Sequence, residues 1–284
     1  MKYLLTFFFF STVFSQTKGI VVDSLGTPIP YVNIWLEGEN VGTTSEEDGT
    51  FLINCSKDKL LVFSAVGFET KKTTLTNGEK VVLESKIYEL NEVVISKIKN
   101  TKDYTTSNAK KRFYLPEPQI IPWILGLKFS SQEDYNYIKS LIFYTNSEVE
   151  NGMFRARIFT IGNDGLPNED VLPEELLVNV KKGKQKIIVN VMHYKIKIPK
   201  EGIVVAFESL LINQNKYIQK GTISNSKKST EFLNFSPHIL YFYNNTIESY
   251  SYRAGKWAGF STEFYDKYKD IKMPIPAIEL ILTN

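Results

Sequence analysis

Apolar and polar residues alternate in short runs along most of the chain, and turn residues close each run. Residues 31–36 place Val32, Ile34 and Leu36 on one face, which is typical of a strand with one buried side. Residues 60–65 are instead apolar almost without interruption, which favours a strand in the middle of a sandwich. Short strands at this even spacing predict an N-terminal β-sandwich.

The same pattern returns after residue 124. Strand candidates there are residues 137–144, 153–161, 187–191, 203–211, 239–243, 247–252 and 278–282. Tyr, Phe, Val, Ile and Thr are abundant and long helical patterns are scarce, so the whole chain is predicted to be all-β. Arg155 and Arg157 share one face of a strand, and Glu208 lies on another. A buried Arg–Glu pair with a structural role is therefore one expectation.

The first fifteen residues differ from the rest. A short basic start precedes a nearly unbroken apolar run over residues 4–14, and Ser15 then stands before Gln16. This pattern predicts a signal peptide over residues 1–15, because the run is shorter than the roughly 20 apolar residues of a spanning helix. We expect an exported protein without a transmembrane helix after signal removal. It would lie in the periplasm, with the outer membrane or at the cell surface.

Charge and composition narrow the function classes. The formal net charge of +3 is small for 284 residues and gives no concentrated basic face, so we expect no nucleic-acid partner. The single cysteine, Cys55, cannot form an internal disulfide. No Gly-x-Ser-x-Gly motif, phosphate-binding loop or dinucleotide fingerprint occurs, so we predict no catalytic residue and no cofactor.

A set of short segments near the N-terminus, in this order and spacing, resembles a known module. The segments are residues 18–23, 28–34, 42–51, 65–69 and 90–94. They are similar to the carboxypeptidase-regulatory-like module, a transthyretin-like β-sandwich of Bacteroidetes envelope proteins. The resemblance implies an accessory domain over residues 16–95 that has no active site. The module also precedes the plug and barrel of outer-membrane TonB-dependent receptors, but the remaining chain is too short for that barrel.

The rest of the chain divides into a polar linker, predicted over residues 96–123, and a second domain over residues 124–284. Residues 154–159, 163–167 and 198–208 together resemble a jelly-roll-type domain that trails the regulatory-like module in other Bacteroidetes proteins. The resemblance implies a second β-sandwich. Carbohydrate-binding modules share this architecture, but the fold does not imply their function.

The sequence shows neither the ligands of a zinc peptidase nor the spacing of a calcium-binding loop. A zinc carboxypeptidase needs His and Glu ligands and a general base, but His193 and His238 stand alone. Zinc carboxypeptidase activity is therefore rejected, and no metal site is predicted. The acidic cluster at residues 46–48 lacks the spacing of a calcium loop, so we predict a solvated turn before Gly49.

One aromatic and basic segment is the best candidate for ligand binding: Tyr250, Tyr252, Arg253 and Trp257. Aromatic rings offer flat faces to sugar rings or peptide side chains, and arginine adds directional donors. The alternative is a hairpin that turns at residues 254–255, with Trp257 packed into the sandwich. Both interpretations fit the sequence.

The sequence thus predicts a non-catalytic, exported cell-envelope protein that binds a glycan or an envelope protein partner through its C-terminal sandwich. The alternative is an envelope hydrolase, glycosidase-like, with two carboxylates in a cleft of that domain. Asp134, Asp164, Glu208 and Glu263 are available for it, but the sequence singles out none of them. A third possibility is a structural subunit that offers a sheet edge to its partner.

Overall fold

A computed structural model describes residues 16–56, 58–75, 78–86, 98–106, 113–115, 121–222, 229–244, 247–260 and 274–284. The predicted signal peptide lies outside these residues. The two regular helices in them are single 3₁₀ turns, η1 (Met192–Tyr194) and η2 (Asn213–Asn215), and strands make up the rest of the regular structure. The predicted all-β class is confirmed.

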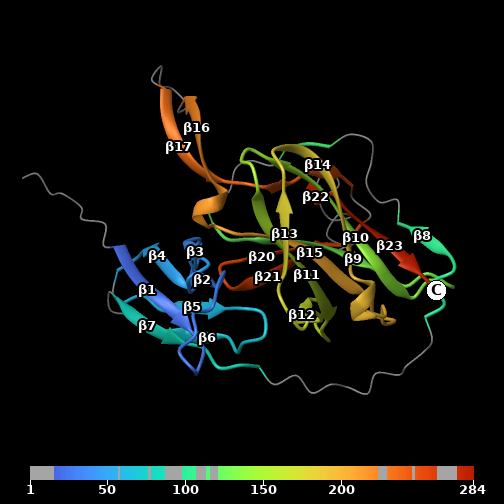
Figure 1. Ribbon diagram of the computed structural model, residues 1–284, viewed down its shortest axis with the longest axis horizontal. Coiled ribbons are helices and arrows are strands. Elements are labelled where there is room, and N and C mark those ends of the chain that lie inside the picture. The colour runs from blue at the N-terminus through green and yellow to red at the C-terminus, as the bar shows by residue number, and fades with distance from the viewer. Residues whose placement is uncertain are drawn as a thin grey trace, which may run out of the picture.

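The N-terminal part, up to residue 86, is a sandwich of two small sheets (Figure 1). Its strands are β1 (Gln16–Val22), β2 (Asn33–Leu36), β3 (Gly42–Thr44), β4 (Thr50–Asn54), β5 (Leu61–Ser64), β6 (Lys71–Thr73) and β7 (Glu79–Val82). One sheet has the order β4-β1-β7 and the other the order β3-β2-β5-β6. Apolar side chains from both sheets fill one core, and Val21, Ile34, Phe51 and Phe63 are among them. The strands form here because each alternates core-facing with outward residues, as in the buried-exposed pattern of β4.

The C-terminal part is a larger sandwich. Its strands are β8 (Asp103–Thr105), β9 (Ile124–Phe129), β10 (Tyr137–Ser147), β11 (Gly152–Ile161), β12 (Pro167–Asp170), β13 (Leu176–Val180), β14 (Gly183–Asn190), β15 (Ile203–Ser209), β16 (Lys216–Thr222), β17 (Ser229–Phe235), β18 (His238–Ile239), β19 (Tyr241–Tyr243), β20 (Ser249–Arg253), β21 (Lys256–Phe260), β22 (Pro274–Pro276) and β23 (Ile278–Thr283). One sheet runs β12-β11-β15-β9-β20-β21, with β13 also on β11. The other runs β14-β10-β23-β8, with β18 also on β10.

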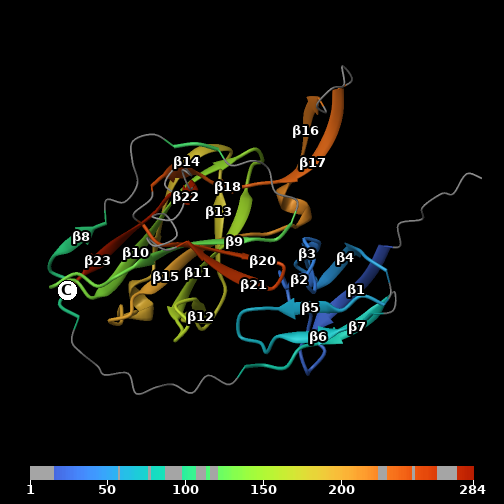
Figure 2. The same ribbon diagram turned by 180° about the vertical axis from the view of Figure 1, so that it is seen from behind.

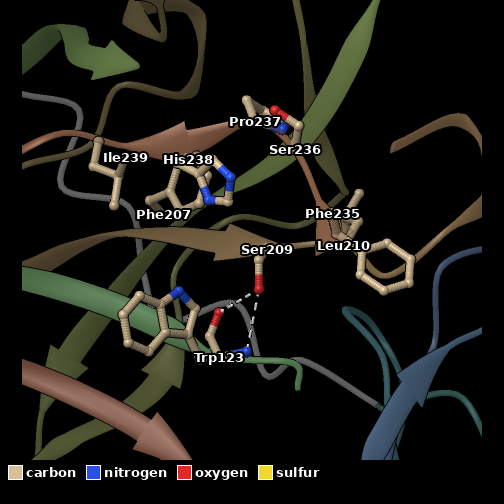
Figure 3. A pocket seen from close by; sticks show the side chains of 9 residues that line it. All are labelled: Trp123, Phe207, Ser209, Leu210, Phe235, Ser236, Pro237, His238 and Ile239. Carbon is tan, nitrogen blue, oxygen red and sulfur yellow. Dashed lines mark hydrogen bonds between the residues drawn. The ribbon is translucent and has the colours of Figure 1, made fainter. Parts of the chain in front are cut away.

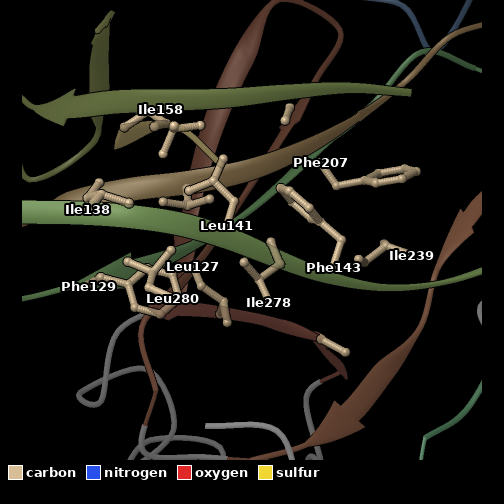
Figure 4. Close-up of a cluster of buried hydrophobic side chains, with 14 of the residues drawn as sticks. Leu127, Phe129, Ile138, Leu141, Phe143, Ile158, Phe207, Ile239, Ile278 and Leu280 are labelled. Carbon is tan, nitrogen blue, oxygen red and sulfur yellow. The ribbon is translucent and has the colours of Figure 1, made fainter. Parts of the chain in front are cut away.

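These two sheets share one core, which Figure 4 shows from close by. Leu141 and Phe143 come from β10, Phe207 comes from β15, and Leu280 comes from β23. The apolar side chains of each strand face the opposite sheet, and this alternation is why the strands could be predicted from the sequence. The strand β8 falls inside residues 96–123, the predicted linker, and it extends the second sheet by pairing with β23.

A two-stranded arm leaves the body of the C-terminal sandwich. Strands β16 and β17 pair only with each other among the described residues, in a register that sets Ile218 opposite Leu233. Figures 1 and 2 show the arm projecting away from both sandwiches, beside the N-terminal one. The arm is anchored at its root by the buried Asn215. Its side chain accepts a hydrogen bond from the Met153 amide at 2.8 Å and donates to two carbonyl oxygens.

The two sandwiches pack against each other. Trp35 lies edge-on to Tyr252 with 5.3 Å between ring centroids, and Tyr31 packs in one apolar cluster with Met153, Leu210 and Ile212. The alternation of β2 places Trp35 on the face away from the N-terminal core. The side chain is nevertheless only 3% exposed, because the C-terminal sandwich covers it. Burial on both faces of β2 therefore marks a contact between the sandwiches.

Candidate functional site

A groove lies between the N-terminal sandwich and the root of the arm. Its volume is about 910 Å³. The N-terminal wall consists of β1, β3 and β4, and the opposite wall includes Leu211, Asn213, Lys216, Leu233 and Phe235. No single segment of sequence makes this site, because it forms where the two sandwiches and the arm meet.

The N-terminal wall presents a sheet face and a sheet edge. Lys18 of β1 stands opposite Leu52 of β4, and both point away from the core. Leu52 is 52% exposed, whereas its neighbours Phe51 and Ile53 are buried in the N-terminal core. All five residues of β4 line the groove, and β4 is the terminal strand of its sheet. The wall therefore offers an apolar side chain and the backbone edge of a strand.

The arm supplies the facing wall. In the β16–β17 register, Lys216 stands opposite Phe235 and Ile218 opposite Leu233, so these four side chains share one face of the hairpin. Leu233 is 47% exposed and Ile218 is 56% exposed. Phe232 lies on the other face, packs over Gly221, and is also 40% exposed. The arm thus carries large apolar side chains that its own hairpin does not bury.

The inner end of the groove is polar and fixed by contacts between the sandwiches. The amide of Leu211 donates to Thr44 Oγ1 at 3.1 Å, and the amide of Asn213 donates to Glu46 Oε1 at 3.0 Å. Burial raises the pKa of the Glu46 carboxyl, and the hydrogen bond from Asn213 opposes this effect. These contacts hold the arm root at a set distance from β3 and β4.

A much smaller cavity lies behind the arm root (Figure 3). It offers about 10 Å³, roughly the room for a single water molecule. Ser209 and Trp123 bond to each other at its edge, where the Trp123 amide donates to Ser209 Oγ at 3.2 Å. His238 also lines it, and its Nε2 lies 3.1 Å from the hydroxyl oxygen of Tyr217. Burial lowers the pKa of His238. The cavity is too small for a substrate.

Charged side chains are buried where the sandwiches meet, and the expected Arg–Glu pair is among them. Glu208 Oε2 lies 3.3 Å from Arg155 Nη1 and 3.2 Å from Arg157 Nη1, which confirms that prediction. Arg155 Nη2 also contacts Glu175 Oε1 at 2.6 Å, and Arg157 Nε contacts Asp170 Oδ2 at 2.6 Å. Arg155 and Glu208 are almost completely buried, so this network belongs to the structure of the interface.

The four residues predicted to bind a ligand lie on one hairpin, β20–β21. Ala254 and Gly255 form its two-residue turn, both with positive φ, as the type I′ turns of hairpins require. The alternative interpretation of this segment as a hairpin is confirmed. The role of these residues as ligand contacts stays a prediction.

The surroundings of these four side chains are mostly protein. Tyr250 is buried and donates its hydroxyl to the Gly165 carbonyl oxygen at 3.1 Å. Trp257 packs against Tyr252, with 5.0 Å between ring centroids, and edge-on against Phe159 at 5.1 Å. Arg253 is exposed, and its guanidinium carbon lies 4.3 Å from the centre of the Trp123 ring. Arg253 is the most accessible member of the set.

Catalytic chemistry has few candidates among the described residues. In this part of the chain, no three His, Cys, Asp or Glu side chains are grouped in a way that could hold a metal ion. The ring of His193 packs at a tilt against that of its neighbour Tyr194 in η1. Of the carboxylates considered for a hydrolase, Glu208 is held by two arginines, and Glu263 lies outside the described residues. Within the described ranges, none of the helices is long and apolar enough to cross a bilayer.

Comparison with known proteins identifies the first part of the chain. Residues 17–95 match the family model of the CarboxypepD_reg-like domain. The TonB-dependent receptor SusC of Bacteroides thetaiotaomicron is 30% identical over 78 residues, and the TonB-dependent receptor P39 of Formosa agariphila is 30% identical over 84 residues. Each match covers 28% of this chain and 8% of the relative, so the chain spans a small fraction of either receptor's length.

Similar solved structures are more distant. The cysteine protease and lectin-like domains of Cwp84, a surface layer associated protein of Clostridium difficile, match with 12% identity and a TM-score of 0.40. That match covers 86% of this chain and 46% of the other. The structure of the Gx strain of infectious bursal disease virus matches with 10% identity and a TM-score of 0.24, over 94% of this chain and 62% of the other. The sequence matches and the N-terminal sandwich agree, and residues 17–95 are a CarboxypepD_reg-like domain.

Proposed function

We propose that this chain is an exported, non-catalytic protein of the cell envelope that binds a protein partner in the groove between its N-terminal sandwich and its arm. The observation that carries the proposal is the pairing of two half-exposed leucines, Leu52 and Leu233, on opposite walls of that groove. Apolar side chains gathered around a groove mark an interaction site, because water exposure of such a patch is unfavourable. The arm and its root belong to the C-terminal sandwich, the part expected to bind.

Family and charge support a role in binding without catalysis. CarboxypepD_reg-like domains are non-catalytic regulatory domains, and the two relatives are named as receptors. The carboxylate that a hydrolase would use most readily on β15, Glu208, is buried between Arg155 and Arg157. Buried and paired in this way, it is poorly placed to act on a bound substrate.

Export is proposed from the sequence. The apolar run of residues 4–14 has the length and flanks of a signal peptide, and the relatives' name as TonB-dependent receptors supports a place in the envelope. A glycan remains the second proposed ligand. The observation in its favour is Arg253, which is exposed beside the ring of Trp123 and could offer donors and an aromatic face together.

Binding and hydrolysis assays on the purified chain test the proposal. The chain is screened on a glycan array, incubated with envelope extract, and assayed for release of reducing sugars from polysaccharides. We expect a protein ligand that is captured by the wild type and by Ile188→Lys but lost by Leu233→Lys. Ile188 is a matched control, since it is 56% exposed on β14, away from the groove. No ligand in either screen, together with reproducible hydrolysis, would refute the proposal.

A further inference from the structure

The edge of β4 lacks the features that normally protect a terminal strand. The Thr50 amide and carbonyl are bonded to Asp48 Oδ1 and the Glu46 amide, so the open stretch of this edge begins at Leu52. No strand pairs with that stretch among the described residues, and Thr50–Asn54 contains neither Lys nor Pro. Proteins usually protect such edges with charged side chains, prolines or bulges, because exposed backbone donors and acceptors recruit other strands. Because Phe51 and Ile53 pair with Gly19 and Thr17 of β1, the outward backbone groups of this edge belong to the alternate residues, and two of these, Leu52 and Asn54, line the groove. The natural ligand of such an edge is another extended polypeptide.

The arm opposite β4 also lacks a cover. A two-stranded hairpin is only marginally stable in water by itself. This one nevertheless stands away from the body (Figure 2). Ile218 and Leu233 are half-exposed on one face of it, and Leu233 lines the groove. Asn215 and Asn213 fix the root of the arm, so the spacing between Leu233 and Leu52 is built into the fold. The groove thus has a backbone edge on one side and an apolar row on the other.

We propose that this groove accepts one extended strand of a different protein, which pairs its backbone with β4 and places alternate apolar side chains between Leu52 and Leu233. The inference rests on the proposed function and names the chemistry of its partner. Because side chains alternate along a strand, the partner segment would read apolar at every second position.

The charge of the groove favours a strand of another protein over the arm of a second copy of this chain as its ligand. Lys18, Lys216 and Glu46 line the groove, so the charged lining has one more positive than negative group. The face of the arm that carries Ile218 and Leu233 holds Lys216 and the ion pair of Lys220 with Glu231 at 3.8 Å, so Lys216, which also lines the groove, gives the same excess. An arm from a second copy would bring like charge to like charge, whereas a strand with neutral or acidic residues between its apolar positions would match the lining.

A displayed library of random peptides of about ten residues, the length of a long strand, provides the probe. The library is selected on the immobilised full chain, and the enriched peptides are synthesised and titrated by fluorescence anisotropy. We expect sequences with apolar residues at alternate positions. Leu52→Lys and Leu233→Lys should each weaken their binding about tenfold or more, which corresponds to about 1.4 kcal/mol. N-methylation of alternate peptide amides should abolish binding, because it removes the donors that pair with β4.

Ile188→Lys and Leu25→Lys are the matched controls, since both residues are exposed and lie outside the groove lining. They should bind the peptides as the wild type does. All four replaced residues are exposed, and thermal unfolding would verify that the variants are folded. Failure to enrich any peptide, equal binding by Leu52→Lys, or insensitivity to N-methylation would each overturn the inference. If an envelope ligand still requires Leu233 in that case, the proposed function stands and only the strand mode of binding fails.

Discussion

Arg155 donates a hydrogen bond from Nη2 to the main-chain carbonyl oxygen of Tyr31 at 2.6 Å, although the two residues are 124 positions apart. Tyr31 adopts a left-handed backbone with φ of 54°, which is uncommon for a residue with a side chain. Its ring packs among Met153, Leu210 and Ile212 of the other sandwich. This contact joins the CarboxypepD_reg-like domain to β11 and helps to fix the wall of the groove relative to the arm.

Replacement of Arg155 by Met should destabilise the protein strongly. The substitution removes the bond to Tyr31 and leaves the buried Glu208 and the partly buried Glu175 with less positive charge beside them. Breaking a buried ion pair in this way costs about 3–5 kcal/mol. Urea unfolding measures the loss, and separate transitions for the two sandwiches would show that the interface has weakened.

Arg253→Met is the control for that variant. Arg253 is exposed and lies over the Trp123 ring, a contact worth about 0.5–1 kcal/mol. A loss of stability in Arg155→Met no larger than that of Arg253→Met would contradict a structural role for the buried network.

The carboxyl of Glu175 should make stability depend on pH. Burial raises its pKa, the nearby Glu208 carboxylate adds to the rise, and Arg155 opposes it. Because the folded state holds this proton more tightly than the unfolded chain, the stabilisation is present at acid pH. It is lost as pH rises from the ordinary value near 4.5 through the raised value.

Glu175→Gln isolates this effect, because glutamine keeps the shape and stays neutral. The variant should gain stability relative to the wild type as pH rises through that window, and urea unfolding at a series of pH values would measure the difference. A difference that stays constant, or that changes in the opposite direction, would count against a raised pKa for Glu175.

His238 at the arm root should show the opposite dependence. Burial lowers its pKa, while Glu148 opposes the shift, and the ring contacts the Tyr217 hydroxyl. The folded state therefore prefers neutral histidine. The stabilisation is present above the ordinary value near 6.5 and is lost as pH falls through the lowered value. The stability of His238→Phe relative to the wild type should rise on acidification, as measured by thermal unfolding. A relative stability that does not change with pH would contradict this.

The stability of the C-terminal sandwich should depend strongly on Phe154. This side chain is fully buried, stacks on Phe207 with 4.5 Å between ring centroids, and meets Phe143 edge-on at 5.1 Å. Phe154→Ala should cost about 3–5 kcal/mol by chemical denaturation, because a cavity remains. Phe232→Ala, on the exposed arm, should cost only about 0.5 kcal/mol or less. Similar costs for both would show that the assigned core is wrong.

Local alternation was sufficient to predict the strands that face a core. Residues 137–144 and 153–161 were predicted as strands and lie within β10 and β11, because each second side chain there faces the opposite sheet. The Arg–Glu pair was also predictable, since Arg155 and Arg157 share a face by spacing alone. Which arginine contacts which carboxylate depended on the register between β11 and β15, which sets Arg155 opposite Glu208.

The groove could not be predicted in this way. Trp35 falls on the outward face of β2, and it is buried because the C-terminal sandwich covers it, with the ring of Tyr252 among its contacts. The strands of the arm were not predicted, because Ile218 and Leu233 face no core and share their face of the hairpin with Lys216, Lys220 and Glu231. Leu52 is outward-facing in its own strand, and its role depends on an arm more than 150 residues further along the chain. Contacts between distant segments leave no periodic signal.

Photo-crosslinking in the native host tests most directly whether the groove is the binding surface. A photoreactive benzoylphenylalanine replaces Leu233 or Leu52 in the groove, or Ile188 or Leu25 outside it, and cells are irradiated before the envelope is isolated. We predict a discrete crosslinked product with an envelope protein from both groove positions and from neither control position. The absence of a product from positions 233 and 52, or an equal product from position 188, would contradict binding in the groove.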